Sequence, residues 1–191
     1  WRVGQAVLHC SGADPAAILE PAAAQGARIG TVHPLQTFAN AQQALRNIPG
    51  STFALDAGET LLSQLKDIVN ALEGHHIEVS AADRVLYHAA AVMASNYTVT
   101  LVKLASDLWA NFGVSQPRAV AALLPLIRGT IHNIETVGLP DCLTGPISRG
   151  DVGTVSKHLA ALDGAAPEIA TTYRELGRQT VPVALAKGKI D

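Results

Sequence analysis

The chain has 191 residues, of which 48% are hydrophobic and 4% aromatic, so it can bury a large core without disulfides. Its 14 basic and 16 acidic side chains give a net charge of −2, which excludes the clustered basic surface of a nucleic-acid-binding protein. No apolar run reaches the ~20 residues of a membrane span, and no signal peptide is recognisable, so we expect a cytoplasmic protein without membrane partners.

Residues 1–81 alternate short apolar runs with helical patterns. The pattern predicts, in chain order, strands at 6–10, 27–32, 51–55 and 75–79, and helices at 15–25 and 60–72. Asp14 is expected to cap the first of these helices, with Pro15 at its first position and Gly26 after its end. His33-Pro34 is expected to form a rigid turn. Alternation of strands and helices indicates a largely parallel, Rossmann-like sheet.

From residue 82 the strand signals vanish. Apolar residues recur every three or four positions from Leu86 to Leu108, which predicts one helix of about seven turns that ends at Gly113. Three more helices are expected, at 115–138 with a kink at Pro125, at 151–162, and at 167–185 with a second kink site at Pro182. The predicted class is therefore α/β followed by all-α: a truncated Rossmann-like domain at 1–81 and a helical domain at 82–191.

The long helix carries polar side chains on an otherwise apolar surface. His88 and Ser95 are seven residues apart and so share one face at a separation of ~10 Å, with Asn96 on the flank of that face. Polar groups of this kind need partners, and a substrate carbonyl or imine would serve. The alternative is that they bind the backbone of a neighbouring loop or cap another helix.

The loop at 143–151 is a second candidate site. Its glycines allow backbone N–H groups to approach an anion, and Arg149 can bind a carboxylate or phosphate. We therefore assign Thr144, Gly145 and Arg149 to substrate binding, with Asp151 at the start of the next helix. The alternative is an ordinary connection with a solvated Arg–Asp pair.

The ends of the first two strands form a third candidate site, because ligands of open α/β sheets bind beyond the carboxyl ends of the strands. The residues that fall there, Ser11, Gly12, His33 and Pro34, are assigned to cofactor binding. The alternative for His33 is a structural histidine that stabilises the turn by a hydrogen bond. No zinc-ligand spacing occurs, so no metal is expected. Two well-separated cysteines outside any CxxC pair favour reduced thiols, Cys10 and Cys142.

The segments LHCSG, VHPLQTF, LYHAAAVMASNY, LTGPISRGD and HLAAL occur in this order. Their layout resembles a bacterial family that joins a Rossmann-like domain to a helical C-terminal domain of unknown function. It is similar to pyrroline-5-carboxylate reductase and, more distantly, to ketopantoate reductase and the β-hydroxyacid dehydrogenases. The resemblance implies a C-terminal domain like that of 6-phosphogluconate dehydrogenase. It also implies an upstream segment bearing the GxGxxG turn, which this sequence lacks, and its start without Met is consistent with a truncated chain.

The resemblance carries over to individual residues only in part. Thr144-Gly145-Pro146 matches the Thr-Ser-Pro start of the reductase loop, but the catalytic threonine of that loop has no counterpart. Asn96 stands where the dehydrogenases have the Asn of a Lys-xxx-Asn motif, whereas the lysine position is Val92. His88, one turn earlier, is the substitute proton donor.

These observations predict an NAD(P)-dependent oxidoreductase that reduces a small keto or imino acid by hydride transfer, at the cleft between the domains. His88 or Asp151 would supply the proton, and Ser95 and Asn96 would orient the substrate. One alternative is a non-catalytic dinucleotide-binding or assembly protein that retains the fold, and another is a stable proteolytic core. The apolar stripe between Leu123 and Ile134 predicts a homodimer through the helical half.

Overall fold

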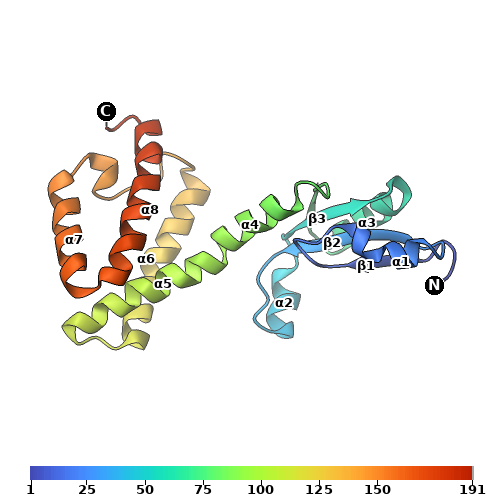
Figure 1. Ribbon diagram of the computed structural model, residues 1–191, viewed down its shortest axis with the longest axis horizontal. Coiled ribbons are helices and arrows are strands. Elements are labelled where there is room, and N and C mark those ends of the chain that lie inside the picture. The colour runs from blue at the N-terminus through green and yellow to red at the C-terminus, as the bar shows by residue number, and fades with distance from the viewer. Residues whose placement is uncertain (191) are drawn as a thin grey trace. The chain divides into compact units, whose positions relative to one another are not determined.

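A computed structural model of the chain describes residues 1–190. The chain forms two compact units, the first from Trp1 to Thr98 and the second beginning at Val99. The first unit contains the sheet and the second is helical (Figure 1). The predicted class, α/β followed by all-α, is confirmed. The predicted domain boundary after residue 81 remains a prediction.

The first unit is built on a four-stranded sheet. Its strands, in spatial order, are β1 (Ala6–His9), β2 (Arg28–Leu35), β3 (Thr52–Ala57) and β4 (His75–Glu78). The β1–β2 and β3–β4 pairs are parallel, whereas β2 and β3 are antiparallel. The carboxyl ends of β1 and β2 therefore lie at the same edge of the sheet, as the sequence predicted for its cofactor site.

The prediction of a turn at His33-Pro34 is wrong. Strand β2 runs on to Leu35, with His33 paired to Ala54 and Pro34 to Phe53. A proline is tolerated there because β1 ends opposite Thr31, so one edge of β2 is unpaired at Pro34 and a missing N–H interrupts no ladder on that side.

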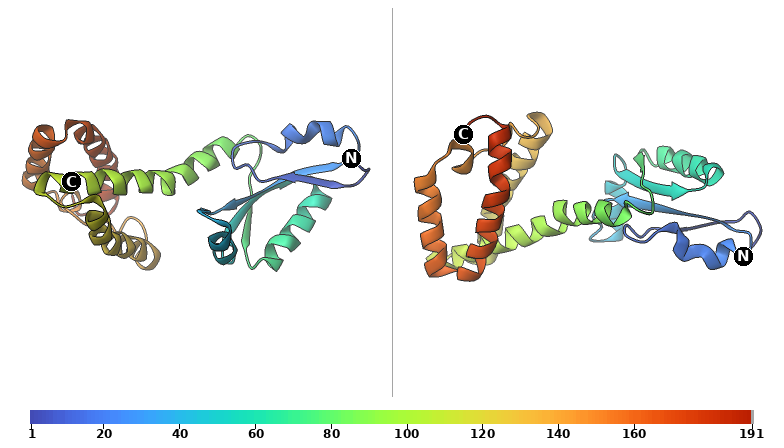
Figure 2. Two further views of the ribbon diagram at one scale, coloured as in Figure 1. Left: turned by 90° about the horizontal axis from the view of Figure 1, so that it is seen from below. Right: turned by 45° about the horizontal axis from the view of Figure 1, so that its top comes forward.

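Helices cover both faces of the sheet: the η1–α1 segment and α3 lie on opposite sides in both views of Figure 2. The predicted helix at 15–25 is instead a 3₁₀ turn, η1 (Ala16–Leu19), followed by one turn of α1 (Glu20–Ala23). The helix that follows η1 has Pro21 in its first turn, where a proline's missing N–H costs no hydrogen bond. Helix α2 (Ala41–Asn47), which the sequence analysis missed, begins after an Asn40 side chain that accepts a hydrogen bond from Gln43 N.

Helix α3 (Glu59–Ala71) supplies the main core of the first unit. Its side chains Leu61, Leu65 and Val69 are buried against Phe53 and Leu55 of β3. The sequence pattern predicted Leu61 and Leu65 on this face together with Ile68 and Leu72, but the latter two are 51% and 40% exposed and Val69 is buried instead.

The long predicted helix is divided at Ser95. Helix α4 (Arg84–Ala94) belongs to the first unit, and α5 (Asn96–Leu108) follows at once. A 3₁₀ turn, η2 (Trp109–Phe112), completes the segment before Gly113, whose φ of 77° confirms the predicted left-handed cap.

The second unit continues with α6 (Gln116–Thr136), the 3₁₀ turn η3 (Ile147–Arg149), α7 (Val152–Ala165) and α8 (Pro167–Ala186). Leu162, Ile169 and Ala170 form its buried core, with Leu104 and Leu108 packed against them. The predicted prolines lie inside helices that continue past them, Pro125 in α6 and Pro182 in α8.

Within residues 1–190, the stretch Arg84–Phe112 is long and apolar enough to cross a membrane by length and composition, with a mean hydropathy of 1.2. None of its most apolar window is buried in this single chain. The apolar runs of this stretch are interrupted, as expected from the sequence, by His88, Ser95 and Lys103. These residues do not bring the mean hydropathy of an 18-residue window below the value needed for a membrane span. An exposed apolar helix also suits a surface that a second protein chain covers.

Candidate active site

A cavity of about 790 Å³ lies in the first unit between the end of β2 and helix α4. Four residues that the sequence singled out line it: His33, His88, Ser95 and Asn96. His33 comes from β2 and His88 from the second turn of α4, while Ser95 and Asn96 stand where α4 gives way to α5. The fold thus brings one predicted cofactor residue to the same cavity as three predicted catalytic residues.

A residue that the sequence analysis left without a role, Tyr87, also lines this cavity. Its hydroxyl is 2.8 Å from His33 Nδ1, and the two rings meet edge to face with centroids 5.6 Å apart. Burial, together with the nearby charges of His88 and Arg84, lowers the pKa of His33. Burial raises the pKa of Tyr87. At neutral pH the pair therefore consists of a neutral imidazole and a protonated phenol.

Gly12 stands where two imidazoles converge. A Cβ atom added at this position would lie 2.5 Å from His88 Nδ1 and 2.8 Å from His33 Nε2, closer than side chains tolerate. Only glycine allows the turn after β1 to pass beside both rings. The structure thus gives a steric reason for a glycine at position 12, while its role in cofactor binding remains a prediction.

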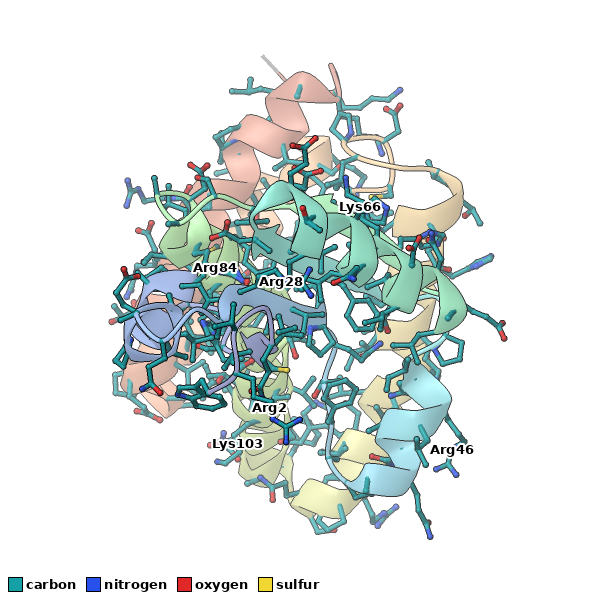
Figure 3. The ribbon with its side chains drawn as sticks, turned by 90° about the vertical axis from the view of Figure 1, so that its right-hand side faces the viewer. Arg2, Arg28, Arg46, Lys66, Arg84 and Lys103 are labelled. Atoms are coloured by element: carbon teal, nitrogen blue, oxygen red, sulfur yellow. The ribbon has the colours of Figure 1, made fainter. Side chains whose placement is uncertain are left out.

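A fully buried arginine fastens this end of the sheet to helix α4. Arg84 projects from the first turn of α4 (Figure 3) and is 0% exposed. Its Nε donates to the Asp14 carbonyl at 3.1 Å, and its Nη2 donates to the hydroxyl of Thr31, which is also fully buried. Among residues 1–190, Arg84 Nη1 and His88 Nδ1 are the buried side-chain atoms without a hydrogen-bond partner. A buried cation with an unused donor makes this edge favourable for an electron-rich ligand.

The loop after β1 is held as a tight turn. Ser11 Oγ donates to Asp14 Oδ2 at 2.7 Å and accepts from Asp14 N at 3.2 Å, while Ser11 N donates to His9 Nδ1 at 3.1 Å. Because Ser11 and Asp14 are hydrogen-bonded to each other, the backbone of Gly12, which lies between them in the chain, is held in place. Ser11 is thus placed at the predicted edge, with its hydroxyl engaged by Asp14.

The loop in the second unit lines a different cavity, of about 430 Å³. Its lining includes the predicted residues Thr144, Gly145 and Arg149. It also includes two lysines that were not predicted, Lys187 and Lys189. Lys187 Nζ donates to the carbonyls of residues 141 and 143 at 2.8 and 2.7 Å, so it also holds the loop in shape. Gly145 has a φ of 93°, which explains a glycine at that position.

Asp151 has the geometry of a helix N-cap. Its Oδ1 accepts from Thr154 N at 2.9 Å, and its Oδ2 accepts from Thr154 Oγ1 at 2.7 Å. These hydrogen bonds lower the pKa of Asp151, so it is a carboxylate at neutral pH and a poor proton donor. Asp151 is therefore the N-cap of α7.

Metal ligation finds no support in the described part of the chain, where no group of three or more His, Cys, Asp or Glu side chains is placed to hold an ion. Both thiols, Cys10 and Cys142, are unpaired.

The family model described as a domain of unknown function (DUF2520) matches residues 51–180. The chain belongs to this family. No curated protein matches the chain. The family match spans both units, and it confirms the resemblance to a Rossmann-like family with a helical C-terminal domain.

Solved structures share the fold. A protein from Thermotoga maritima is 26% identical, with a TM-score of 0.81 over 94% of this chain and 69% of its own. A candidate NADP oxidoreductase from Bacteroides fragilis is 22% identical, with a TM-score of 0.74 over 93% of this chain and 65% of its own. Pyrroline carboxylate reductase from Plasmodium falciparum, solved with NADP bound, is 18% identical, with a TM-score of 0.57 over 96% and 69%. This chain therefore spans about two thirds of each of these proteins and has the fold of NADP-dependent reductases.

Proposed function

We propose that the protein is an NAD(P)-dependent oxidoreductase that reduces a small keto or imino acid. The observation that carries the proposal is the convergence of His33 and His88 on Gly12, at the strand ends where open α/β sheets bind ligands. Solved relatives support it: one is a pyrroline carboxylate reductase with NADP bound, and another is a reductive aminase in complex with NADPH.

The residues at this edge fit the nicotinamide end of a dinucleotide. Gly12 presents bare backbone in a place that a Cβ would fill, and Arg84 Nη1 and His88 Nδ1 are buried nitrogens without partners within residues 1–190. Ser11, Gly12, His33 and Pro34 would hold this part of the cofactor. When bound, NADP or NAD supplies the hydride.

His88 donates the proton in the proposed reaction. It lines the cavity at His33 and Tyr87 and receives no competing hydrogen bond at Nδ1 from the described residues. Ser95 and Asn96 line the same cavity and orient the carbonyl or imine through their polar heads. A positioned general acid typically contributes 10²–10⁴-fold to the rate.

The loop of the second unit is assigned to the binding of an anion. Thr144, Gly145 and Arg149 line a cavity with Lys187 and Lys189, so several donors and positive charges surround one space. Removal of Arg149 is expected to weaken anion binding at this loop, because its guanidinium can form paired hydrogen bonds to a carboxylate or phosphate.

We further propose a cytoplasmic homodimer that binds small molecules and neither nucleic acid nor membrane. The support is the exposed apolar surface of α6, on which Leu126 is 66% exposed, Ile131 48% and Ile134 41%. An exposed apolar surface marks a protein interface. Light scattering is expected to give twice the chain mass, and a monomeric mass contradicts this assignment.

The test uses the protein in the full length that its gene encodes. Calorimetry with NADPH and NADH measures binding, and a panel of 2-keto and cyclic imino acids measures turnover. We expect binding, turnover of at least one substrate, and a loss of about 10²–10⁴-fold in kcat for His88→Ala. The matched control is His132→Ala, since the His132 side chain in α6 is 69% exposed, and it should leave kcat unchanged. Asp151→Asn, which retains a capping side chain, should stay within a few-fold of the wild type.

Failure to bind either dinucleotide contradicts the whole proposal. Binding without turnover on the entire panel favours the non-catalytic alternative. Normal kcat in His88→Ala, with strong loss in Asp151→Asn, transfers the proton-donor role to Asp151.

A further inference from the structure

The cavity at His88 extends along α4 past the residues assigned to the reaction. We propose that this extension binds a bulky, uncharged, apolar substituent of the substrate, such as a phenyl ring or a branched alkyl chain, and that Ala91 sets its size limit. The inference rests on the proposed reductase function and narrows its substrate class. Its basis is the lining of the cavity, in which apolar residues of the sheet face small residues of the helix.

The floor of the cavity is the face of the sheet that α3 does not cover. His33 on β2 is paired with Ala54 on β3, and Ala54 is paired with Ile77 on β4, so these three side chains share one face. Leu35 lies two residues after His33 on the same strand and points to that face too. Leu35 and Ile77 line the cavity and are 40% and 42% exposed. Two apolar side chains beside His33 thus have surface available to a ligand.

Helix α4 forms the wall of the cavity with short side chains. Between His88 and Ser95 the lining residues are Ala90, Ala91, Val92 and Ala94. Ala91 is three residues after His88 and four before Ser95, so the three share one helix face. The large apolar side chains Leu86 and Met93, which are 76% and 66% exposed, are not part of the lining that the described residues form. The wall is therefore recessed where it faces the cavity, and the protruding apolar side chains point elsewhere.

The size and chemistry of the space select the substituent. A volume of about 790 Å³ lies within the range of about 300–1,000 Å³ of pockets that bury a drug-sized ligand. Along α4 the lining runs from His88 to Asn96, a rise of ~12 Å, which exceeds what a side chain of one or two carbons fills.

The lining also lacks partners for a charged substituent. Among the described residues that line the cavity, none is Lys, Arg, Asp or Glu, so a charged group there would lose its hydration without an ion pair in return. Phe38, which is 42% exposed, instead adds an aromatic ring to the lining. Such a ring favours a flat or branched apolar group.

A protein partner on the same surface predicts something different. In that case a larger residue at position 91 changes the oligomeric state or the stability, and it acts alike on every substrate. A size limit acts on large substrates and spares small ones. The ratio of kcat/KM between a large and a small substrate therefore separates the two roles.

The kinetic experiment uses the full-length enzyme with NADPH and 2-keto acids whose side chain grows from methyl to ethyl, isobutyl and benzyl. In the wild type we expect kcat/KM to rise about fourfold for each CH₂ that the cavity buries. Ala91→Leu should lower kcat/KM for the benzyl compound about 10- to 100-fold, because the added side chain occupies the space, and should leave the methyl compound within about threefold. The matched control is Ala89→Leu, since Ala89 is exposed on the same helix and outside the described lining. This control should retain the wild-type series.

A second variant removes apolar contact in place of adding bulk, and it serves if Ala91→Leu fails to fold. Ile77→Ala should lower kcat/KM for the benzyl compound about 10-fold and spare the methyl compound. Its control is Ile68→Ala on α3, because Ile68 is 51% exposed and lies outside the described lining.

A further measurement does not depend on turnover. Phenylpyruvate, with pyruvate as its small counterpart, is titrated without NADPH into full-length protein that carries ¹³C in its isoleucine δ1 methyl groups. Phenylpyruvate should shift the signal of Ile77 and leave that of Ile68 in place, and pyruvate should shift neither.

Three results overturn the substituent site: an Ile77 signal that phenylpyruvate does not shift, a wild-type kcat/KM that falls as the side chain grows, or an equal loss across the whole series in Ala91→Leu. If the wild type reduces no compound of the series or of the wider panel, the proposed function fails, while the Ile77 signal still decides whether the cavity binds an apolar group.

Discussion

Two tyrosine–histidine pairs in this protein have nearly the same geometry in different surroundings. In each, a phenol oxygen lies 2.8 Å from a histidine Nδ1, and the rings meet edge to face, at 87° for Tyr87–His33 and 83° for Tyr173–His158. His158 is exposed on α7, whereas His33 is partly buried beside a second histidine and a buried arginine. Pair geometry alone therefore does not define a functional site, because burial and neighbouring charge decide which protons the pair can hold.

The largest effect is expected from Gly12→Ala. This variant tests whether the close packing beside the first pair, Tyr87–His33, is needed for stability and for dinucleotide binding. The added methyl meets both imidazoles, and overpacking of this kind costs about 1–3 kcal/mol in the free energy of unfolding. Dinucleotide binding should be lost with it. Urea denaturation and calorimetry measure the two effects.

The control for that substitution is Gly164→Ala in α7, where an added Cβ meets nothing within 4 Å. This change should raise stability by up to about 1 kcal/mol, because alanine favours the helix. If the two variants had the same free energy of unfolding and the same dinucleotide affinity, the space beside His33 and His88 would not be required for either.

Arg84→Met is expected to have the next largest effect, and it tests the charge beside the first pair. The variant leaves the buried Thr31 hydroxyl without its donor, a loss of about 1–3 kcal/mol in the free energy of unfolding. The pKa of His33 should rise, since one of the charges that lower it is gone. NMR titration of His33 and urea denaturation measure these changes.

Arg174→Met is the matched substitution beside the second pair, Tyr173–His158. Arg174 forms an ion pair with Asp163 in which both side chains are about half exposed, so its loss should cost less than about 1 kcal/mol. A stabilised Arg84→Met protein would instead mean that the cost of burying this cation exceeds the value of its hydrogen bonds.

The smallest expected effect is a pH dependence of stability. Because the pKa of His33 is lowered in the folded protein, the unfolded chain binds its proton more readily. The free energy of unfolding should therefore fall as the pH drops below about 6.5, the ordinary histidine pKa, and the loss should continue until His33 is protonated in the folded state as well. His33→Gln should flatten this slope and His158→Gln should not. Thermal melts between pH 5 and 8, a range about the ordinary histidine pKa, would show the difference.

Local signals made parts of this structure predictable. The apolar face of α3, the cap at Gly113 and the N-cap at Asp151 each depend on residues within a few positions of one another. The antiparallel pairing of β2 with β3 was not predictable in this way, and it overturned the turn at His33-Pro34.

The candidate site was predicted only in part for the same reason. His88, Ser95 and Asn96 were found because they interrupt an apolar helix. Tyr87 was missed because its partner His33 lies 54 positions away, and Arg84 because Thr31 lies 53 positions away. Pairs of that separation leave no periodic signal in a single sequence.

The buried Arg84 has a thermodynamic consequence for binding. One guanidinium holds the carbonyl of Asp14 in the turn after β1, the hydroxyl of Thr31 on β2, and, through its own backbone, the first turn of α4. His88 follows one helical turn later. Any ligand that orders the Ser11–Asp14 turn therefore also orders the helix that carries His88, and by reciprocity a substrate that orders His88 must tighten binding at the turn.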